Sequence, residues 1–193
     1  MISTALAAVF FLAVSSGPVQ PATTPATHPA ATAATVAVAV THAVSPRYSY
    51  LSADEQEFID RINAARTERG LCALAPDPVL VQDAWTQSCD MATHGYFSHI
   101  APEANRRSPM DRYLDALRAA HERVPSALLV GENIYYCSMS RGTQDVALAQ
   151  QALMASPGHR ANILDPRFRQ VGVGVYRNAA GEIWVTEVFL YKN

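Results

Sequence analysis

Val171-Gly172-Val173-Gly174-Val175-Tyr176 is the stretch of this sequence that decides the fold. Its valines alternate with glycine or tyrosine, and a period of two is typical of a β-strand. Because glycine has no side chain, one side of such a strand suits close contact with another backbone or with a helix. The stretch therefore predicts a strand that is tightly covered on its glycine side.

A second strand is predicted after a turn at residues 178–181. One of its faces carries Ile183, Val185, Glu187, Phe189 and Tyr191. The other face carries Trp184, Val188 and Leu190, so we expect both faces to be covered. With a further strand near residues 134–137, the sequence predicts a small and mainly antiparallel sheet.

Helices are predicted upstream of these strands. Ser52 and Glu55 have the spacing of a capping box, in which each side chain bonds a free backbone N–H at a helix start. This pattern predicts a first helix over residues 52–69, and Gly70 supplies the stop.

Three more helices have similar signals. Asp77-Pro78 predicts the start of a second helix, which runs to residue 94 and ends at Gly95. Ser108-Pro109 repeats this start for a third helix, and a fourth covers about residues 144–156. Helices packed around a small sheet give an α+β fold class.

Size and charge limit the kind of protein. A chain of 193 residues with 49% hydrophobic and 17% charged residues has room for one domain with an ordinary core. The net charge is −2 and Arg106-Arg107 is the one adjacent basic pair, whereas nucleic acid usually requires a concentrated basic face. We therefore expect no nucleic-acid partner.

The N-terminal part has the pattern of an exported protein. Residues 5–14 are almost all apolar, which suits a signal-peptide core and is too short to span a bilayer, although no Lys or Arg precedes them. We predict a signal peptide over about residues 1–20, with no transmembrane span after its removal. Residues 21–50 are rich in Pro, Ala and Thr and predict a tether, which leaves residues 51–193 as the folded domain.

Five segments, taken in order, resemble a known family. They are Gly95-Tyr96-Phe97-Ser98-His99, Arg107-Ser108-Pro109, Gly131-Glu132-Asn133-Ile134, residues 156–164 (Ser-Pro-Gly-His-Arg-Ala-Asn-Ile-Leu) and Val171-Gly172-Val173-Gly174. The domain is similar to bacterial members of the CAP superfamily (cysteine-rich secretory, antigen five and pathogenesis-related one), whose domain is also called SCP-like. The resemblance implies a three-layer α-β-α sandwich with a small central antiparallel sheet. It also implies a shallow cleft lined by two histidines and two acidic residues.

The resemblance assigns candidate cleft residues. His99 resembles the first histidine of the cleft, Glu132 the acidic residue of the Gly-Glu-Asn element, and His159 the second histidine. The second carboxylate of the full family set lies in a Trp-x-x-Glu element, where this chain has Leu153 and Ser156. The pattern here is thus two histidines and one carboxylate.

Two roles are open for His99, Glu132 and His159. Two imidazoles and a carboxylate suit a divalent cation such as zinc, with His99 and His159 as ligands. Alternatively, the three side chains hydrogen-bond their surroundings, which is the commoner role of buried polar groups and the one we favour.

Glu187 is a further candidate because its strand face is expected to be buried. A buried carboxylate needs a partner or a raised pKa. Glu187 either faces the cleft and compensates for Ser156, or pairs with an arginine such as Arg160, which is the interpretation we favour.

The chain has three cysteines, Cys72, Cys89 and Cys137, in a protein predicted to be secreted. One disulfide and one free thiol are expected, and the sequence leaves the pairing open.

Three function classes follow. We favour a secreted, non-enzymatic binding module for an envelope component, a lipid or a protein. The first alternative is a metal-dependent hydrolase of protease or esterase type, in which Glu132 activates water. The second is a structural protein associated with the cell wall through the tether. Metal content, a copurifying ligand and cell fractionation discriminate between them.

Overall fold

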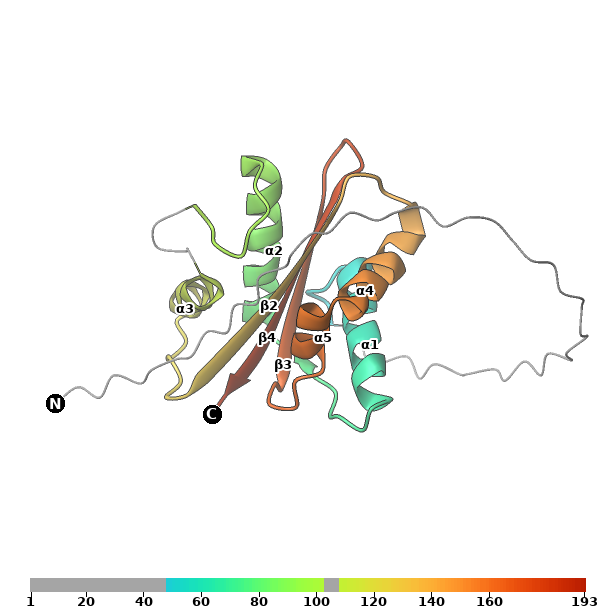
Figure 1. The fold of residues 1–193 in the computed structure, drawn as a ribbon. Coiled ribbons are helices and arrows are strands. Elements are labelled where there is room, and N and C mark those ends of the chain that lie inside the picture. The colour runs from blue at the N-terminus through green and yellow to red at the C-terminus, as the bar shows by residue number, and fades with distance from the viewer. Residues whose placement is uncertain (1–47, 103–107) are drawn as a thin grey trace, which may run out of the picture.

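The computed structural model describes residues 48–102 and 108–193, and within them it forms five α-helices and one four-stranded sheet (Figure 1). The helices are α1 (Ala53–Thr67), α2 (Pro78–His94), α3 (Pro109–Ala119), α4 (Asp145–Ala155) and α5 (Pro157–Ile163), with a short 3-10 helix η1 (Gly142–Gln144) before α4. The strands are β1 (Ala75–Pro76), β2 (Leu128–Cys137), β3 (Gln170–Arg177) and β4 (Ile183–Lys192). The predicted signal peptide, nearly all of the predicted tether, and the Arg106-Arg107 pair lie outside the described residues.

The sheet has the order β1-β3-β4-β2, so β4 is central and β2 forms one edge. β4 pairs antiparallel with both β2 and β3, which confirms the predicted antiparallel sheet for the three long strands. The two-residue β1 adds a short parallel pairing with Gln170 and Val171, which the sequence analysis missed.

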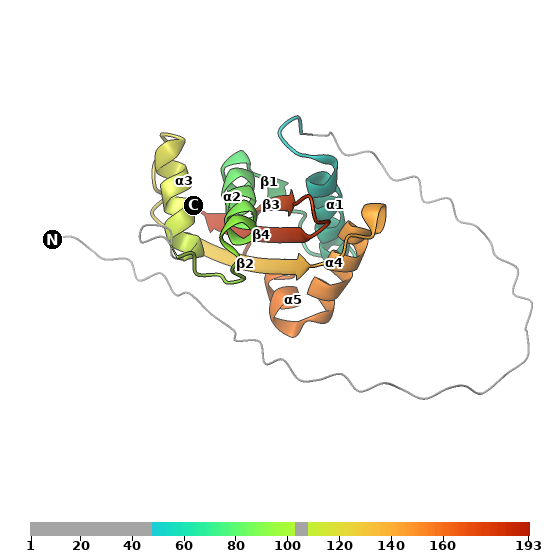
Figure 2. The same cartoon turned by 90° about the horizontal axis from the view of Figure 1, so that it is seen from above.

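Helices cover both faces of the sheet (Figures 1 and 2). Side chains of α1, α4 and α5 form one core with Val185 and Phe189 of β4. Side chains of α2 and α3 form a second core with Val188 and Leu190 of the same strand. The alternation along β4 therefore places apolar groups in two separate cores, and the predicted three-layer α-β-α arrangement is confirmed.

The predicted helix starts are also confirmed. Ser52 and Glu55 make both hydrogen bonds of the capping box at α1. The Asp77 side chain accepts from two backbone N–H groups at the start of α2, and Gly95 ends that helix with a left-handed φ of 67°. Ser108 caps α3, which buries Tyr113 and Leu117.

Two glycines bring α2 directly onto β3. A Cβ atom added at Gly172 would lie within 3.0 Å of the backbone of Leu80, and one added at Gly174 within 3.0 Å of the backbone of Ala84 and Trp85. Helix backbone cannot yield as a flexible side chain can. The alternation of valine and glycine is therefore explained by the contact between α2 and β3.

A hydroxyl group adds a polar contact at the same place. The Ser88 Oγ of α2 donates to the Gly174 carbonyl oxygen at 2.9 Å and lies 2.9 Å from the Thr186 Oγ1 of β4. Because Ser88 and Thr186 are fully buried, these contacts fix the position of α2 along the strands.

Among the described residues, no helix is long and apolar enough to cross a membrane.

Gly174→Ala is expected to destabilise the domain by about 3 kcal/mol or more, because the new methyl group displaces α2 from the sheet. Chemical denaturation followed by circular dichroism measures this loss. Gly95→Ala is the control, since its methyl group meets open space and the substitution carries only the cost of a left-handed φ, about 1–2 kcal/mol. Equal losses in the two variants would contradict the proposed backbone contact.

Candidate functional site

His99 lies in the loop that follows α2, and two side chains hold this loop in place. The Gln87 side-chain amide of α2 donates to the Ser98 carbonyl oxygen at 3.0 Å. The Arg112 guanidinium of α3 donates to the His99 carbonyl oxygen at 3.0 Å. The His99 imidazole, with 33% of its side chain exposed, then lies with Nδ1 2.8 Å from Oε1 of Glu132.

Glu132 points from the edge strand β2 toward the face covered by α2 and α3. Its side chain is 1% exposed, and its second oxygen, Oε2, accepts a charged hydrogen bond from Arg112, which is itself fully buried. Asp83 of α2 lies 3.7 Å from the same guanidinium. Glu132 is therefore the centre of a buried charge network, and both of its oxygens are engaged.

Arg112 is a site residue that the sequence analysis missed. It is next to Tyr113 on a helix whose buried positions were predicted from apolar residues alone, so an arginine there was not considered. The signal was nevertheless present, because a buried Glu132 requires a cation or a raised pKa.

His159 lies on α5, which packs against the β2 edge from the other face of the sheet (Figure 2). Burial lowers the pKa of its imidazole, and the nearby His99 lowers it further. The two imidazoles are therefore close enough for the charge of one to affect the other.

Asparagines attach α5 to β2. The Asn133 side-chain amide donates to the His159 carbonyl oxygen at 3.1 Å. The Asn162 side-chain amide donates to the Glu132 carbonyl oxygen at 3.1 Å and to the Asn133 Oδ1 at 2.9 Å. Gly131 completes the contact, because a Cβ there would lie 2.8 Å from the Phe168 ring. In the Gly-Glu-Asn sequence, Gly131 thus allows the Phe168 ring to pack closely, Glu132 supplies a negative charge, and Asn133 attaches α5.

Ser156 lies at the junction of α4 and α5, three residues before His159. It occupies the N-cap position of α5, although its side chain makes no capping hydrogen bond. A hydroxyl at this position supplies no negative charge, and the carboxylate that contacts His99 is Glu132.

Glu187 lies opposite Asn133 in the centre of the sheet, on the face covered by α1, α4 and α5. The Asn133 side-chain amide donates to its Oε2 at 2.9 Å, and its Oε1 has no hydrogen-bond partner within the described part of the chain. Burial raises the pKa of Glu187 to about 7, and the Asn133 hydrogen bond opposes this rise.

The predicted pairing of Glu187 with Arg160 is wrong. Arg160 is exposed and donates to the Met154 carbonyl oxygen at 3.0 Å. Glu187 also does not replace a carboxylate at Ser156, since it contacts the histidine region through Asn133 rather than directly. A buried carboxylate needs either a charged partner or a raised pKa, and Glu187 has the raised pKa.

The expected disulfide is not formed. Cys72, Cys89 and Cys137 are all free thiols. Cys89 lies on α2, whereas Cys137 packs into the core on the opposite face of the sheet, so the sheet separates them. Cys72 is exposed in the loop after α1.

The histidine pair does not make a three-ligand metal site. No group of three or more His, Cys, Asp and Glu side chains suited to a metal ion occurs in residues 48–102 and 108–193. Glu132 is engaged by His99 and Arg112, which leaves two imidazoles, whereas catalytic zinc usually has three protein ligands. The two imidazoles alone supply fewer protein ligands than a catalytic zinc usually has.

Glu187→Gln is expected to remove a pH dependence of stability. The pKa of Glu187 is about 7 in the folded protein and lies near 4.5 in the unfolded chain, so the folded state binds a proton more tightly. The stability that this group contributes is fully present below pH 4.5 and is lost as the pH rises through 7. The amide remains neutral at every pH and still accepts the Asn133 hydrogen bond.

Urea denaturation between pH 4.5 and pH 8.5 tests this expectation. The advantage of Glu187→Gln over the wild type should increase with pH, to on the order of 3 kcal/mol. Glu68→Gln, on a side chain that is 72% exposed, serves as the control and should show no such trend. A constant difference across the pH range would show that Glu187 has the same pKa in the folded and the unfolded chain.

Comparison with known proteins agrees with this geometry. The model of the CAP family, described as the cysteine-rich secretory protein family, matches residues 59–189. The protein YkwD of Bacillus subtilis is 32% identical over 152 residues, which are 79% of this chain and 52% of that protein. The chain therefore spans about half the length of this relative.

Solved structures give the same result. An extracellular protein of Bacillus anthracis that contains an SCP domain is 31% identical, with a TM-score of 0.58 over 72% of this chain and 40% of that one. An outer surface protein of Borrelia burgdorferi shares the fold, with a TM-score of 0.59 at 15% identity over 72% of this chain and 93% of that one. The family match covers both histidines, Glu132 and the valine-glycine strand, and the chain accordingly belongs to the cysteine-rich secretory protein (CAP) family.

Proposed function

We propose that this protein is a secreted binding module, and that the surface around His99 and His159 at the β2 edge contacts its ligand. The predicted signal peptide over residues 1–20 and tether over residues 21–50 support export. The similar Bacillus anthracis protein, which is described as extracellular, supports it as well.

The engagement of Glu132 carries the choice of binding over catalysis. A general base must reach its proton directly or through one water. Glu132 is almost fully buried, its two oxygens contact His99 and Arg112, and neither is directed at an accessible substrate. Glu132 therefore orients His99 instead of activating water.

The accessible groups suit recognition. Phe97 and Ile100 flank His99 and are exposed, so apolar surface adjoins a hydrogen-bonding imidazole. His159 has a lowered pKa and is therefore largely neutral at neutral pH. A ligand with both apolar and hydrogen-bonding groups, such as a lipid, an envelope component or a protein segment, matches this surface.

Native mass spectrometry of the protein isolated from its own secretion medium tests the proposal. A copurifying ligand should be present in the wild type and reduced at least about tenfold in His99→Ala and His159→Ala, because each removes a contacting imidazole. His94→Ala is the matched control, since His94 is exposed on α2, pairs with Asp90, and should leave the ligand bound.

The same spectra and an activity assay separate the alternatives. Ligand retention in both histidine variants would overturn the proposed surface. Stoichiometric zinc, lost in both variants together with hydrolysis of peptide or ester substrates, would instead establish the hydrolase. The processed N-terminus in these spectra also tests the predicted signal peptide.

A further inference from the structure

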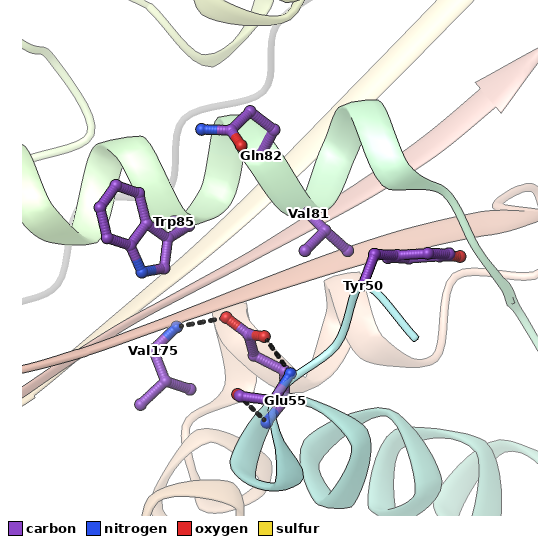
Figure 3. A pocket seen from close by; sticks show the side chains of 7 residues that line it. Tyr50, Glu55, Val81, Gln82, Trp85 and Val175 are labelled. Atoms are coloured by element: carbon purple, nitrogen blue, oxygen red, sulfur yellow. Dashed lines mark hydrogen bonds between the residues drawn. The ribbon is translucent and has the colours of Figure 1, made fainter. Parts of the chain in front are cut away.

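A hollow lies beside β3, on the side of the sheet away from the edge strand β2. Figure 3 shows the residues that line it. Its volume is about 310 Å³, at the small end of the range for small-molecule pockets, roughly 300–1,000 Å³. It is lined by Tyr50, Ser52, Glu55, Val81, Gln82, Trp85 and Val175. These residues come from the segment before α1, the first turn of α1, α2 and β3.

The hollow exists because β1 is short. β1 pairs only with Gln170 and Val171, so the remainder of β3 is not covered by a neighbouring strand at this edge. The first turn of α1 closes the edge instead, where Glu55 accepts a hydrogen bond from the Val175 backbone N–H at 3.3 Å. The carboxylate of Glu55 thus forms the floor of the hollow.

Among the described residues, Glu55 is a buried carboxylate that forms no ion pair with a cationic side chain. The residue is 5% exposed. Its oxygens accept from the backbone N–H groups of Ser52 and Val175, and no ion pair to it occurs in the described part of the chain. The N-terminal end of α1 offsets part of this charge, and no side-chain cation in residues 48–102 and 108–193 is paired with it.

Aromatic rings form the walls. Trp85 of α2 is 42% exposed and Tyr50 is 40% exposed, and in the close-up they lie on opposite sides of Glu55 (Figure 3). The Trp85 ring packs edge-on against the Tyr176 ring, with 6.4 Å between the ring centroids. The Tyr50 hydroxyl donates to the Pro76 carbonyl oxygen at 3.3 Å. Both rings are thereby positioned while their accessible parts stay open to a ligand.

From this arrangement we propose that the hollow binds a methylated ammonium group, such as that of choline. Aromatic walls attract a cation through their π-electrons, and a buried carboxylate supplies the opposite charge. Each oxygen of Glu55 already accepts a backbone N–H, so a cation that brings charge and apolar methyl groups fits better than one that must donate several hydrogen bonds. Val81 and Val175 provide apolar surface for those methyl groups.

Calorimetric titration of the full-length protein with choline chloride tests the proposal. Choline should bind with one site per chain, and the neutral isostere 3,3-dimethylbutan-1-ol should bind at least about tenfold more weakly. Glu55→Gln should weaken choline binding by a similar factor. Glutamine also serves at this position of a capping box, but its single oxygen replaces only one of the two acceptors that Glu55 offers to the Ser52 and Val175 N–H groups, so circular dichroism is used to check that the variant is folded.

Trp85→Leu should weaken choline binding as well, whereas Tyr191→Leu, at an exposed aromatic residue outside the hollow, should not. His99→Ala, at the other edge of the sheet, should also leave choline binding unchanged, so the outcome is independent of the proposed function. Phosphatidylcholine vesicles identify the source of the group: binding to the vesicles indicates a lipid headgroup, and binding to free choline alone indicates a soluble ligand. Equal affinity for choline and its neutral isostere, or unchanged affinity in Glu55→Gln, would overturn the proposal.

Discussion

The contact of the α2 backbone with β3 is the constraint on which the remainder of the structure depends. Gly172 and Gly174 admit the helix to a distance at which no side chain fits between the two backbones. Protein interiors are packed at the density of organic crystals, so such a contact fixes both the height and the direction of the helix. α2 then carries functional groups to both edges of the sheet.

Different sides of α2 serve the two edges. On one side, Gln87 holds the loop that presents His99, and that loop meets Glu132 on the edge strand β2. On another side, Trp85 and Val81 form a wall of the hollow above Glu55. A displacement of α2 would therefore disturb both regions, although they share no side-chain contact that the structure shows.

The edge strand β2 carries two neighbouring polar networks on opposite faces. Glu132 points to Arg112 and His99, whereas the next residue, Asn133, points to Glu187. The free-energy cost of burying a carboxylate is offset differently at Glu132 and at Glu187. Glu132 has a cation, and breaking such a buried pair typically costs about 3–5 kcal/mol. Glu187 has an amide and a raised pKa, so its burial depends on pH instead.

Much of the fold was predictable because its determinants are local. Capping at Ser52, Asp77 and Ser108 depends on residues within one helical turn, and the alternation along β4 reflects the two cores directly. The candidate cleft residues came from family motifs, and the structure brings His99 to Glu132 and near His159. What the sequence analysis missed depends on contacts between distant segments.

Arg112 and Arg160 illustrate this limit. Both are arginines in helices near the motifs, yet Arg112 is fully buried against Glu132 and Arg160 bonds a helix carbonyl at the surface. No local pattern separates these outcomes, because they are determined by which helix face meets the sheet. The hollow at Glu55 is a similar case, since it results from the early end of β1 far along the chain.

The surface around His99 and His159 lies at one edge of the sheet and the hollow at Glu55 lies at the other, and this arrangement has a physical reason. Edge strands present backbone groups that must be paired, covered or charged to avoid association with other chains. Here α5 packs at the β2 edge through Asn162 and through Asn133 of β2, and the Glu55 carboxylate accepts a hydrogen bond from the open part of β3. Covering an edge with side chains instead of a further strand leaves irregular space and concentrates polar groups in it. The same devices that protect the sheet thus create the two surfaces that we propose as binding sites.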